Sequence, residues 1–325
     1  MAEFKLGWIE PEKRNLYQQA SHISAMAKLP KFAAPPVAGG KPPVGTKLLL
    51  TDLWKHQKVV DLFGEPFSGT HQQTGSCVGV GGGNVIFTTV LADILRRSEN
   101  EKVVFPWFWY NYGMSRFYMG ERTAGEGSLG STFAKSWNED GSSDSAIESL
   151  QTPKPLSTKD GWDWGEKTEL VWSNGAVRRP EMAAESNMHK GTSTPSTSGD
   201  ATRDFVLNGY GCTRAAGTFC NPNTAQVKGD VLIGTENGRG GHQMAYLGYW
   251  NHPTYGELLY NMNQWGKKAY GIDPGGGPAG GYWVHIDAVD RICRSEDGEV
   301  FAFSNYQGYP AQPDLYDWMT QSFYS

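Results

Sequence analysis

The chain has 325 residues and a formal net charge of −5, which allows one large domain with an extension or two small domains. Basic and acidic residues are mixed along the chain, which argues against a nucleic-acid partner. The sequence contains no run of about 18 apolar residues, the length that a membrane-spanning helix needs. Hydrophobic residues make up 38% and aromatic residues 13%, so we expect a core of aromatic side chains with glycines that let them approach.

The cysteine content excludes a disulfide framework. The four cysteines are Cys77, Cys212, Cys220 and Cys293. Cys212 and Cys220 are close enough in sequence to pair, but free thiols are expected because the N-terminus shows no export signal. No metal-ligand spacing such as C-x-x-C or H-E-x-x-H occurs, and we expect no cofactor.

Residues 1–48 are predicted to form an extended arm rich in proline and glycine. The prolines between residues 28 and 45 exclude a long helix there. Apolar anchors separated by these residues predict that the arm lies on a surface, either of its own domain or of a neighbouring subunit; they are Phe4, Trp8, Ile9, Leu29 and Phe32.

Residues 49–325 are predicted to form the folded domain. Its first part, to about residue 150, is rich in helix: residues 85–97 have apolar side chains at helical spacing, and a glycine-rich loop at 125–131 leads into a short helix. A Ser/Thr-rich stretch at about 151–200 is predicted to be an exposed insertion.

The second half is predicted to be rich in strands. Short apolar or alternating segments bounded by glycine or proline lie at 227–235, 241–250, 256–266 and 280–289. A C-terminal tail follows at 291–325. Helices first and strands second predict an α+β fold with two lobes.

Cys77 is a candidate nucleophile. It follows a Thr-Gly-Ser turn and precedes a predicted helix, where free backbone N–H groups and the helix dipole would lower the thiol pKa. The side-chain amide of Gln72 or Gln73, with the Cys77 N–H, could form an oxyanion hole. An ordinary buried thiol is the alternative interpretation of Cys77.

His242 and Asn263 complete the candidate site. His242 begins an alternating strand, which could hold a base rigidly near the thiol. Asn263 lies on the next strand and could fix the imidazole tautomer while Trp265 shields that bond from water. A structural histidine and a turn asparagine are the alternatives.

Four short motifs in this order resemble the papain-like cysteine peptidase family, in a divergent bacterial or bacteriophage form. Residues 72–77 are similar to its nucleophile motif, His242-x-x-Ala245 to its histidine strand, residues 263–266 to its Asn-Ser-Trp-Gly, and residues 281–286 to its Gly-Tyr strand. The resemblance covers residues 50–290. It implies a helical lobe carrying Cys77 and an antiparallel β lobe carrying His242 and Asn263.

The sequence departs from the family pattern at three places. Val78 replaces an aromatic residue, and three glycines, residues 81–83, fall within the catalytic helix, so that either another segment packs closely there or the helix begins irregularly. The oxyanion glutamine lies five residues before Cys77 (Gln72) or four (Gln73), instead of six.

The resemblance implies peptide-bond hydrolysis through a Cys77 thioester, with His242 as acid and base, Asn263 as orienter and Gln72 at the oxyanion, acting on a peptide or protein substrate. An amidase or transferase would use the same groups. The rival prediction is a structural or binding component of a bacteriophage virion, joined to other subunits through the arm, with weak or no catalysis. The expected location is cytoplasmic or virion-associated.

Overall fold

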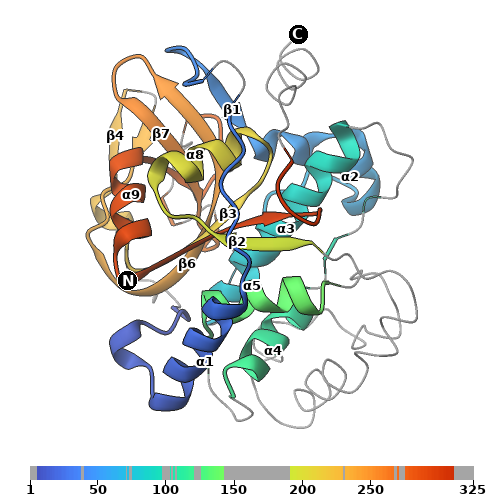
Figure 1. Ribbon diagram of the computed structural model, residues 1–325. Coiled ribbons are helices and arrows are strands. Elements are labelled where there is room, and N and C mark those ends of the chain that lie inside the picture. Colours follow the sequence, from blue (N-terminus) through green and yellow to red (C-terminus); the bar gives the residue numbers. More distant parts are fainter. Residues whose placement is uncertain are drawn as a thin grey trace.

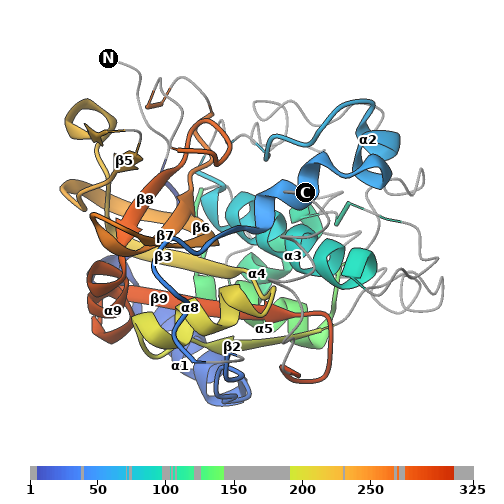
Figure 2. The same cartoon turned by 90° about the horizontal axis from the view of Figure 1, so that it is seen from above.

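The computed structural model describes residues 6–37, 40–70, 72, 75–96, 103, 105–106, 108–120, 126–142, 191–229, 231–266, 269–270 and 275–310. Helices from the first half of the chain gather on one side, and a large sheet from the second half forms the other (Figure 1; Figure 2). The predicted α+β fold class, with a helical and a β lobe, is confirmed.

The buried helix α3 is the centre of the helical lobe. The helices of the described residues are α1 (Leu16–Lys28), α2 (Gln57–Phe63), α3 (Cys77–Arg96), α4 (Phe108–Tyr118), α5 (Gly130–Glu139) and, packed on the sheet, α8 (Gly199–Leu207) and α9 (Ile286–Arg294). 3-10 turns lie at Pro11–Lys13, Leu50–Lys55 and Pro222–Thr224. Within the described part of the chain, α3 is the one helix long and apolar enough to span a membrane, but 94% of its apolar stretch is buried inside the fold.

The glycines of α3 allow close packing. The helix starts regularly at Cys77, so an irregular start is not their explanation. A Cβ at Gly79 would lie 2.7 Å from the Cβ of Tyr112 on α4, and one at Gly82 would lie 2.1 Å from the ring of Phe133 on α5. Both contacts are too short for a side chain, so glycine brings α4 and α5 against α3.

Among the described residues, nine strands form one sheet in the order β2-β9-β3-β6-β7-β8-β5-β4, with β1 also paired to β6. The strands are β1 (Lys47–Leu49), β2 (Thr192–Pro195), β3 (Cys212–Phe219), β4 (Gln226–Lys228), β5 (Val231–Ile233), β6 (Gly238–His252), β7 (Gly256–Met262), β8 (Tyr282–His285) and β9 (Gly298–Ser304). All pairs are antiparallel except β5 with β8. The predicted strands in the second half correspond to β4 through β8.

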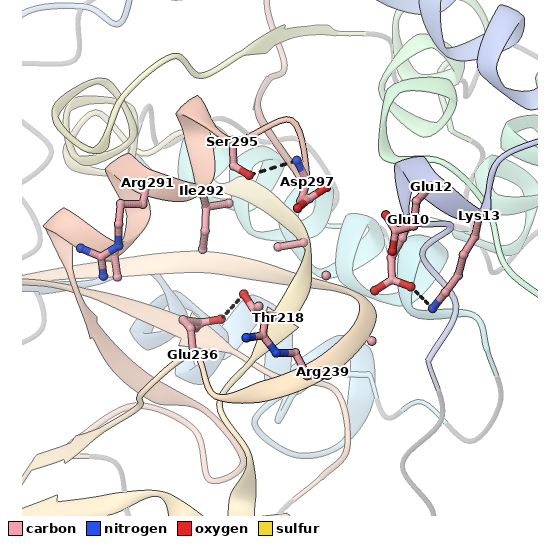
Figure 3. Close-up of a pocket in the computed structure, with 14 residues that line it drawn as sticks. Glu10, Glu12, Lys13, Thr218, Glu236, Arg239, Arg291, Ile292, Ser295 and Asp297 are labelled. Atoms are coloured by element: carbon pink, nitrogen blue, oxygen red, sulfur yellow. Dashed lines mark hydrogen bonds and ion pairs between the residues drawn. The ribbon is translucent and has the colours of Figure 1, made fainter.

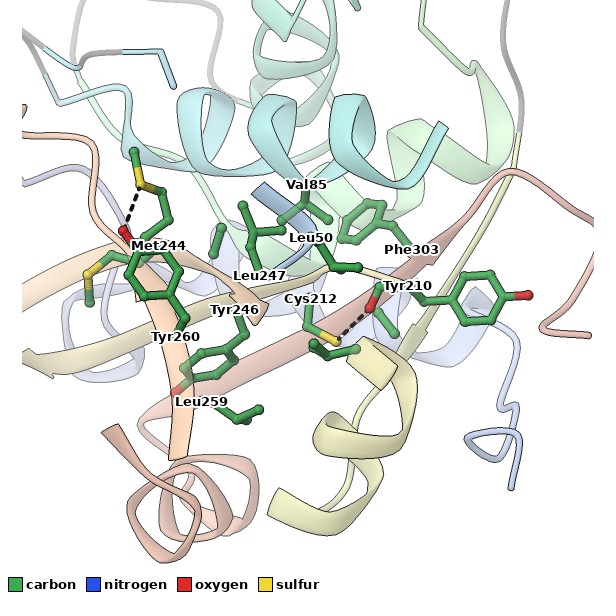
Figure 4. Close-up of a cluster of buried hydrophobic side chains, with 14 of the residues drawn as sticks. Leu50, Val85, Tyr210, Cys212, Met244, Tyr246, Leu247, Leu259, Tyr260 and Phe303 are labelled. Carbon is green, nitrogen blue, oxygen red and sulfur yellow. Dashed lines mark hydrogen bonds between the residues drawn. The ribbon is translucent and has the colours of Figure 1, made fainter. Parts of the chain in front are cut away.

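The hydrophobic core fills the space between α3 and the sheet. Val85 of α3 faces Leu247 of β6 across this layer (Figure 4). Trp54, Trp137 and Trp283 are all at most 1% exposed. The expected aromatic core is therefore present.

Two segments predicted to be peripheral belong to the sheet. β2 lies within the supposed exposed insertion, and β9 lies within the supposed tail; they pair with each other, and β9 also pairs with β3. The composition of β2 misled because buried hydroxyls are tolerated when they are hydrogen-bonded: Ser193 donates to the Ala134 carbonyl at 2.8 Å, and Thr194 to the Pro30 carbonyl at 2.8 Å. The apolar residues of β9, by contrast, do fit a buried strand. Residues 151–190 and 311–325 lie outside the described residues.

The N-terminal arm is not extended throughout, which corrects the prediction for residues 1–48. Helix α1 interrupts it, because Asn15 and Gln18 form a reciprocal capping box that the proline content concealed. The arm lies on its own domain: α1 contacts α5, and Trp8 and Leu29 are buried. Phe4 lies outside the described residues.

Candidate active site

Cys77 is the first residue of α3, and its side chain is wholly buried. Its Sγ accepts a hydrogen bond from the backbone N–H of Gln243 on β6 at 3.3 Å. The thiol therefore stands where the helical lobe meets the β lobe. All four cysteines are free thiols, as expected, so Cys212 and Cys220 do not pair.

His242 lies on β6, directly before the residue that contacts Cys77. Its Nε2 is 2.9 Å from Oδ1 of Asn263, and the ring of Trp265 stacks on the imidazole with centroids 4.4 Å apart and planes 13° apart. Nδ1 of His242 is buried and has no hydrogen-bond partner within the part of the chain described. The structure therefore brings His242 and Asn263 into contact, whereas no hydrogen bond joins Nδ1 of His242 to Sγ of Cys77 among the described residues.

Hydrogen bonds on the side away from His242 fix the orientation of the Asn263 side-chain amide. Its Nδ2 donates to the Tyr270 hydroxyl at 3.0 Å, and that hydroxyl donates to the Cys220 carbonyl at 2.9 Å. These bonds turn Oδ1 toward His242, which makes Nε2 the protonated nitrogen. Asn261, two residues before Asn263, instead donates through Nδ2 to the Tyr282 hydroxyl at 2.8 Å.

Burial dominates the protonation of Cys77 and His242. It raises the pKa of Cys77 to about 12, although the N–H groups of Gln243, Gly7, Trp8 and Val78 oppose the rise. Burial also lowers the pKa of His242 to about 3. The sequence-based expectation of a lowered thiol pKa is wrong for this conformation, because the loss of water outweighs the backbone N–H groups. Both groups are neutral near pH 7.

Gln72 lies beside the loop that carries Asn263. It is buried, and its backbone N–H donates to the Gln264 carbonyl at 2.7 Å. This places the residue at the candidate site without assigning the oxyanion role to its side chain. Gln73 lies outside the described residues, so the choice between the two glutamines stays open.

No family model matches this sequence, and no curated protein is similar to it in sequence. Solved structures are similar to it in fold. Xylellain, a cysteine protease from Xylella fastidiosa, matches with a TM-score of 0.52 over 94% of this chain and 93% of that chain, at 14% identity. This chain has the papain-like cysteine protease fold.

Two further structures were found at lower similarity. Digestive procathepsin L 3 of Tenebrio molitor larval midgut has 11% identity and a TM-score of 0.48, covering 88% of this chain and 78% of that one. Bromelain from Ananas comosus has 13% identity and a TM-score of 0.48, covering 80% and 99%.

In this papain-like fold residues 126–131 of the glycine-rich segment form a wall on the other side of the arm from β6, and Gly127 is held there by α4. Arg116 of α4 is buried and donates through Nη1 to the Gly127 carbonyl at 2.7 Å. The Gly127 N–H donates to the Tyr112 hydroxyl at 3.0 Å. The next residue, Ser128, is thus held with its backbone groups available to another chain segment.

The N-terminal arm occupies the space between this wall and β6. The Ser128 N–H donates to the Gly7 carbonyl at 2.8 Å, and the Ile9 N–H donates to the Ser128 carbonyl at 3.1 Å, which makes a parallel bridge at Trp8. On the other side, the N–H groups of Gly7 and Trp8 reach the Gly241 carbonyl at 3.1 and 3.2 Å. The arm therefore crosses the site one residue from His242.

The fit of the arm at Gly7 leaves no room for a side chain. A Cβ there would lie 1.6 Å from the carbonyl oxygen of Gly75, two residues before Cys77. The arm is thus pressed against the turn that leads into α3, and it buries the thiol. Trp8 was expected as an anchor, whereas Gly7 and Ser128 were not; the glycine-rich loop was the available signal for Ser128.

A cavity of about 710 Å³ lies beside the arm where it leaves the site (Figure 3). Arm residues Glu10 and Lys13, which form an ion pair, face Arg239 of β6 and Arg291 of α9 around it. The lining contains neither Cys77 nor His242. Among the described residues, no group of three or more His, Cys, Asp or Glu side chains could hold a metal ion.

Proposed function

We propose that this chain is a cysteine peptidase that hydrolyses peptide bonds of a peptide or protein substrate, and that the conformation with the arm in place is its latent form. The observation that supports the proposal most is the 2.9 Å contact between His242 Nε2 and Asn263 Oδ1. It leaves Nδ1 as the nitrogen that takes the thiol proton, and Trp265 keeps water from the contact.

The chemistry is nucleophilic acyl transfer. The Cys77 thiol gives its proton to His242 Nδ1, and the sulfur attacks the carbonyl carbon of the scissile bond. The Cys77 N–H and the Gln72 amide stabilise the oxyanion. The C–N bond then breaks, and His242 protonates the leaving amine. Water, deprotonated by His242, cleaves the thioester and restores the thiol.

The arm supports latency. It covers a thiol that is wholly buried and whose pKa is raised to about 12. A substrate that needs the Ser128 backbone groups has to displace residues 7–9 first, because the same N–H and carbonyl are bonded to the arm. Activity therefore requires release of the arm.

Hydrolysis of a fluorogenic peptide mixture by the full chain tests the proposal. Turnover is expected after arm release and is expected to vanish in Cys77→Ser and His242→Ala. Cys293→Ser is the matched control, because Cys293 is also a free thiol but lies on α9 away from the site. Equal turnover in Cys77→Ser would remove the nucleophile assignment.

A second candidate function is a non-catalytic binding or structural component, such as a virion subunit. The burial of Cys77 beneath the arm favours it, because the nucleophile is unreachable in this conformation. A folded chain with a displaced arm and an accessible Cys77 that still hydrolyses no peptide would select this function. An amidase or transferase would be selected by turnover of a non-peptide amide, or by acyl transfer to an added amine.

A further inference from the structure

Glu299 is a buried carboxylate beside the candidate active site. It lies on β9, is 7% exposed, and accepts a hydrogen bond from the backbone N–H of Ser131 at 2.9 Å. Its other oxygen forms an ion pair with the guanidinium of Arg14, and Nδ1 of His22 lies 3.3 Å from the same atom. Both of these partners come from the N-terminal arm.

Gly130 connects Glu299 to the nucleophile. A Cβ at Gly130 would lie 2.7 Å from Oε2 of Glu299 and 3.0 Å from Oε1 of Gln243. The backbone N–H of Gln243 is the donor to Cys77 Sγ. Glu299 and the side chain of Gln243 therefore pack against the same face of Gly130, and the backbone of Gln243 joins this contact to the nucleophile.

The same loop binds the backbone of the arm and orders the carboxylate. Ser128 pairs with the arm on either side of Trp8, and Ser131, three residues later, donates to Glu299. A peptide lying along Ser128 thus has an acidic group next to it. Gln243 Oε1 is a second acceptor here: it is buried and has no hydrogen-bond partner among the described residues.

Arg14 reaches Glu299 by folding back over the arm. The 3-10 turn at Pro11–Lys13 reverses the chain, the Nε of Arg14 donates to the Ile9 carbonyl at 3.1 Å, and the guanidinium lies 5.5 Å from the centre of the Trp8 ring. The Arg14 side chain is only 2% exposed. The arm thus fills the space over Glu299 with a basic side chain.

We propose that Glu299, with Gln243 Oε1, forms a subsite that binds a basic side chain, and that Arg14 occupies it while the arm is in place. As a statement about substrates this rests on the proposed peptidase function: the enzyme selects peptides with Arg or Lys near the scissile bond. When the arm leaves, Glu299 loses Arg14 and His22 and keeps the hydrogen bond from the Ser131 N–H. A buried carboxylate without a counter-charge is unfavourable, and a guanidinium of the substrate would supply the counter-charge that Arg14 provided.

The subsite can be tested without catalysis. In full-length Arg14→Ala, agmatine at millimolar concentration is expected to raise the melting temperature, whereas neutral N-butylurea is not. The response is expected to disappear in Arg14→Ala/Glu299→Gln and to persist in Arg14→Ala/Glu257→Gln, where the changed carboxylate pairs with Arg203 elsewhere on the molecule. No response in Arg14→Ala, or an equal response in the Glu299 double variant, would overturn the subsite.

Substrate selection is tested in a Gly7→Val variant, in which the new side chain would clash with the Gly75 carbonyl and displace the arm. The substrates are peptides that carry Arg, Lys, Leu or Glu at each position. A preference for basic residues at one position, reduced about tenfold or more by Glu299→Gln, is expected from the loss of a charge-assisted hydrogen bond. Cleavage without that preference would overturn the proposal. If no peptide is cleaved, the peptidase function falls, while the agmatine measurement still decides whether Glu299 binds a cation. Circular dichroism establishes that each variant is folded.

Discussion

Gly7→Val is expected to open the candidate active site. Even the first carbon of the new side chain would lie 1.6 Å from the Gly75 carbonyl oxygen and 2.2 Å from the carbonyl carbon. Both atoms belong to the backbone of the turn before α3, so the arm is the part that has to move. Its movement breaks the bonds from Gly7 N–H to Gly241 and from Ser128 N–H to Gly7, at 3.1 and 2.8 Å.

The size of the effect follows from these two bonds. Each contributes about 0.5–1.5 kcal/mol net, so the closed state loses about 1–3 kcal/mol relative to the open state. This corresponds to an increase of about 5- to 150-fold in the open population. Strain in the remaining arm contacts adds to this increase.

Alkylation by limiting iodoacetamide, mapped by mass spectrometry, measures the opening directly. Cys77 is expected to be modified about 5- to 150-fold faster in Gly7→Val than in the parent. Ala20→Val, on the exposed side of α1, is the matched control and is expected to change nothing. A Cys77 rate equal to that of the parent, in a folded Gly7→Val chain, would refute the occlusion of the site by the arm.

Three further predictions concern the same site. In the parent, Cys293 is expected to be alkylated before Cys77, because it is the only one of the four cysteines that is not fully buried; the order is expected to reverse in Gly7→Val. In the opened chain, Asn263→Ala is expected to reduce kcat/KM less than His242→Ala, since the histidine carries the proton and the asparagine orients it; an equal loss would contradict these roles. Burial lowers the pKa of His242 to about 3, so the closed state is favoured while His242 is neutral. As the pH falls below the ordinary pKa of 6.5, the ratio of closed to open chains is expected to fall by up to about tenfold per pH unit. Proteolysis of the arm should accordingly accelerate from pH 7 to pH 4.5, and a rate independent of pH would contradict the burial of His242 by the arm.

Contacts of the candidate site between residues that are close in sequence could be predicted from the sequence. His242 lies on β6, and Asn263 directly follows the neighbouring strand β7 of the same hairpin rather than lying on it, so their contact follows from the pairing of these two strands. Trp265 is two residues from Asn263, and its stacking on the imidazole follows from the same hairpin. Cys77 could be located because a helix start has a recognisable pattern even when glycines follow.

Features that depend on distant contacts could not be predicted. Arg14, Ser131 and Glu299 meet across 285 residues of chain, and none of them belongs to a motif. The pKa of Cys77 depends on how much water the arm excludes, which the helix dipole alone does not reveal. Likewise β2, Thr-Ser-Thr-Pro, has a composition typical of a surface segment, and only its pairing with β9 brings it into the sheet.

Covalent labelling with a peptidyl acyloxymethyl ketone tests the central claim most directly, because this reagent needs a bound peptide and a thiolate placed at its carbonyl group. In the Gly7→Val chain, the account predicts one adduct per molecule, located on Cys77 by peptide mapping and lost in Gly7→Val/His242→Ala. An adduct on Cys293, or labelling of Cys77 that does not require His242, would contradict Cys77 and His242 as the catalytic pair.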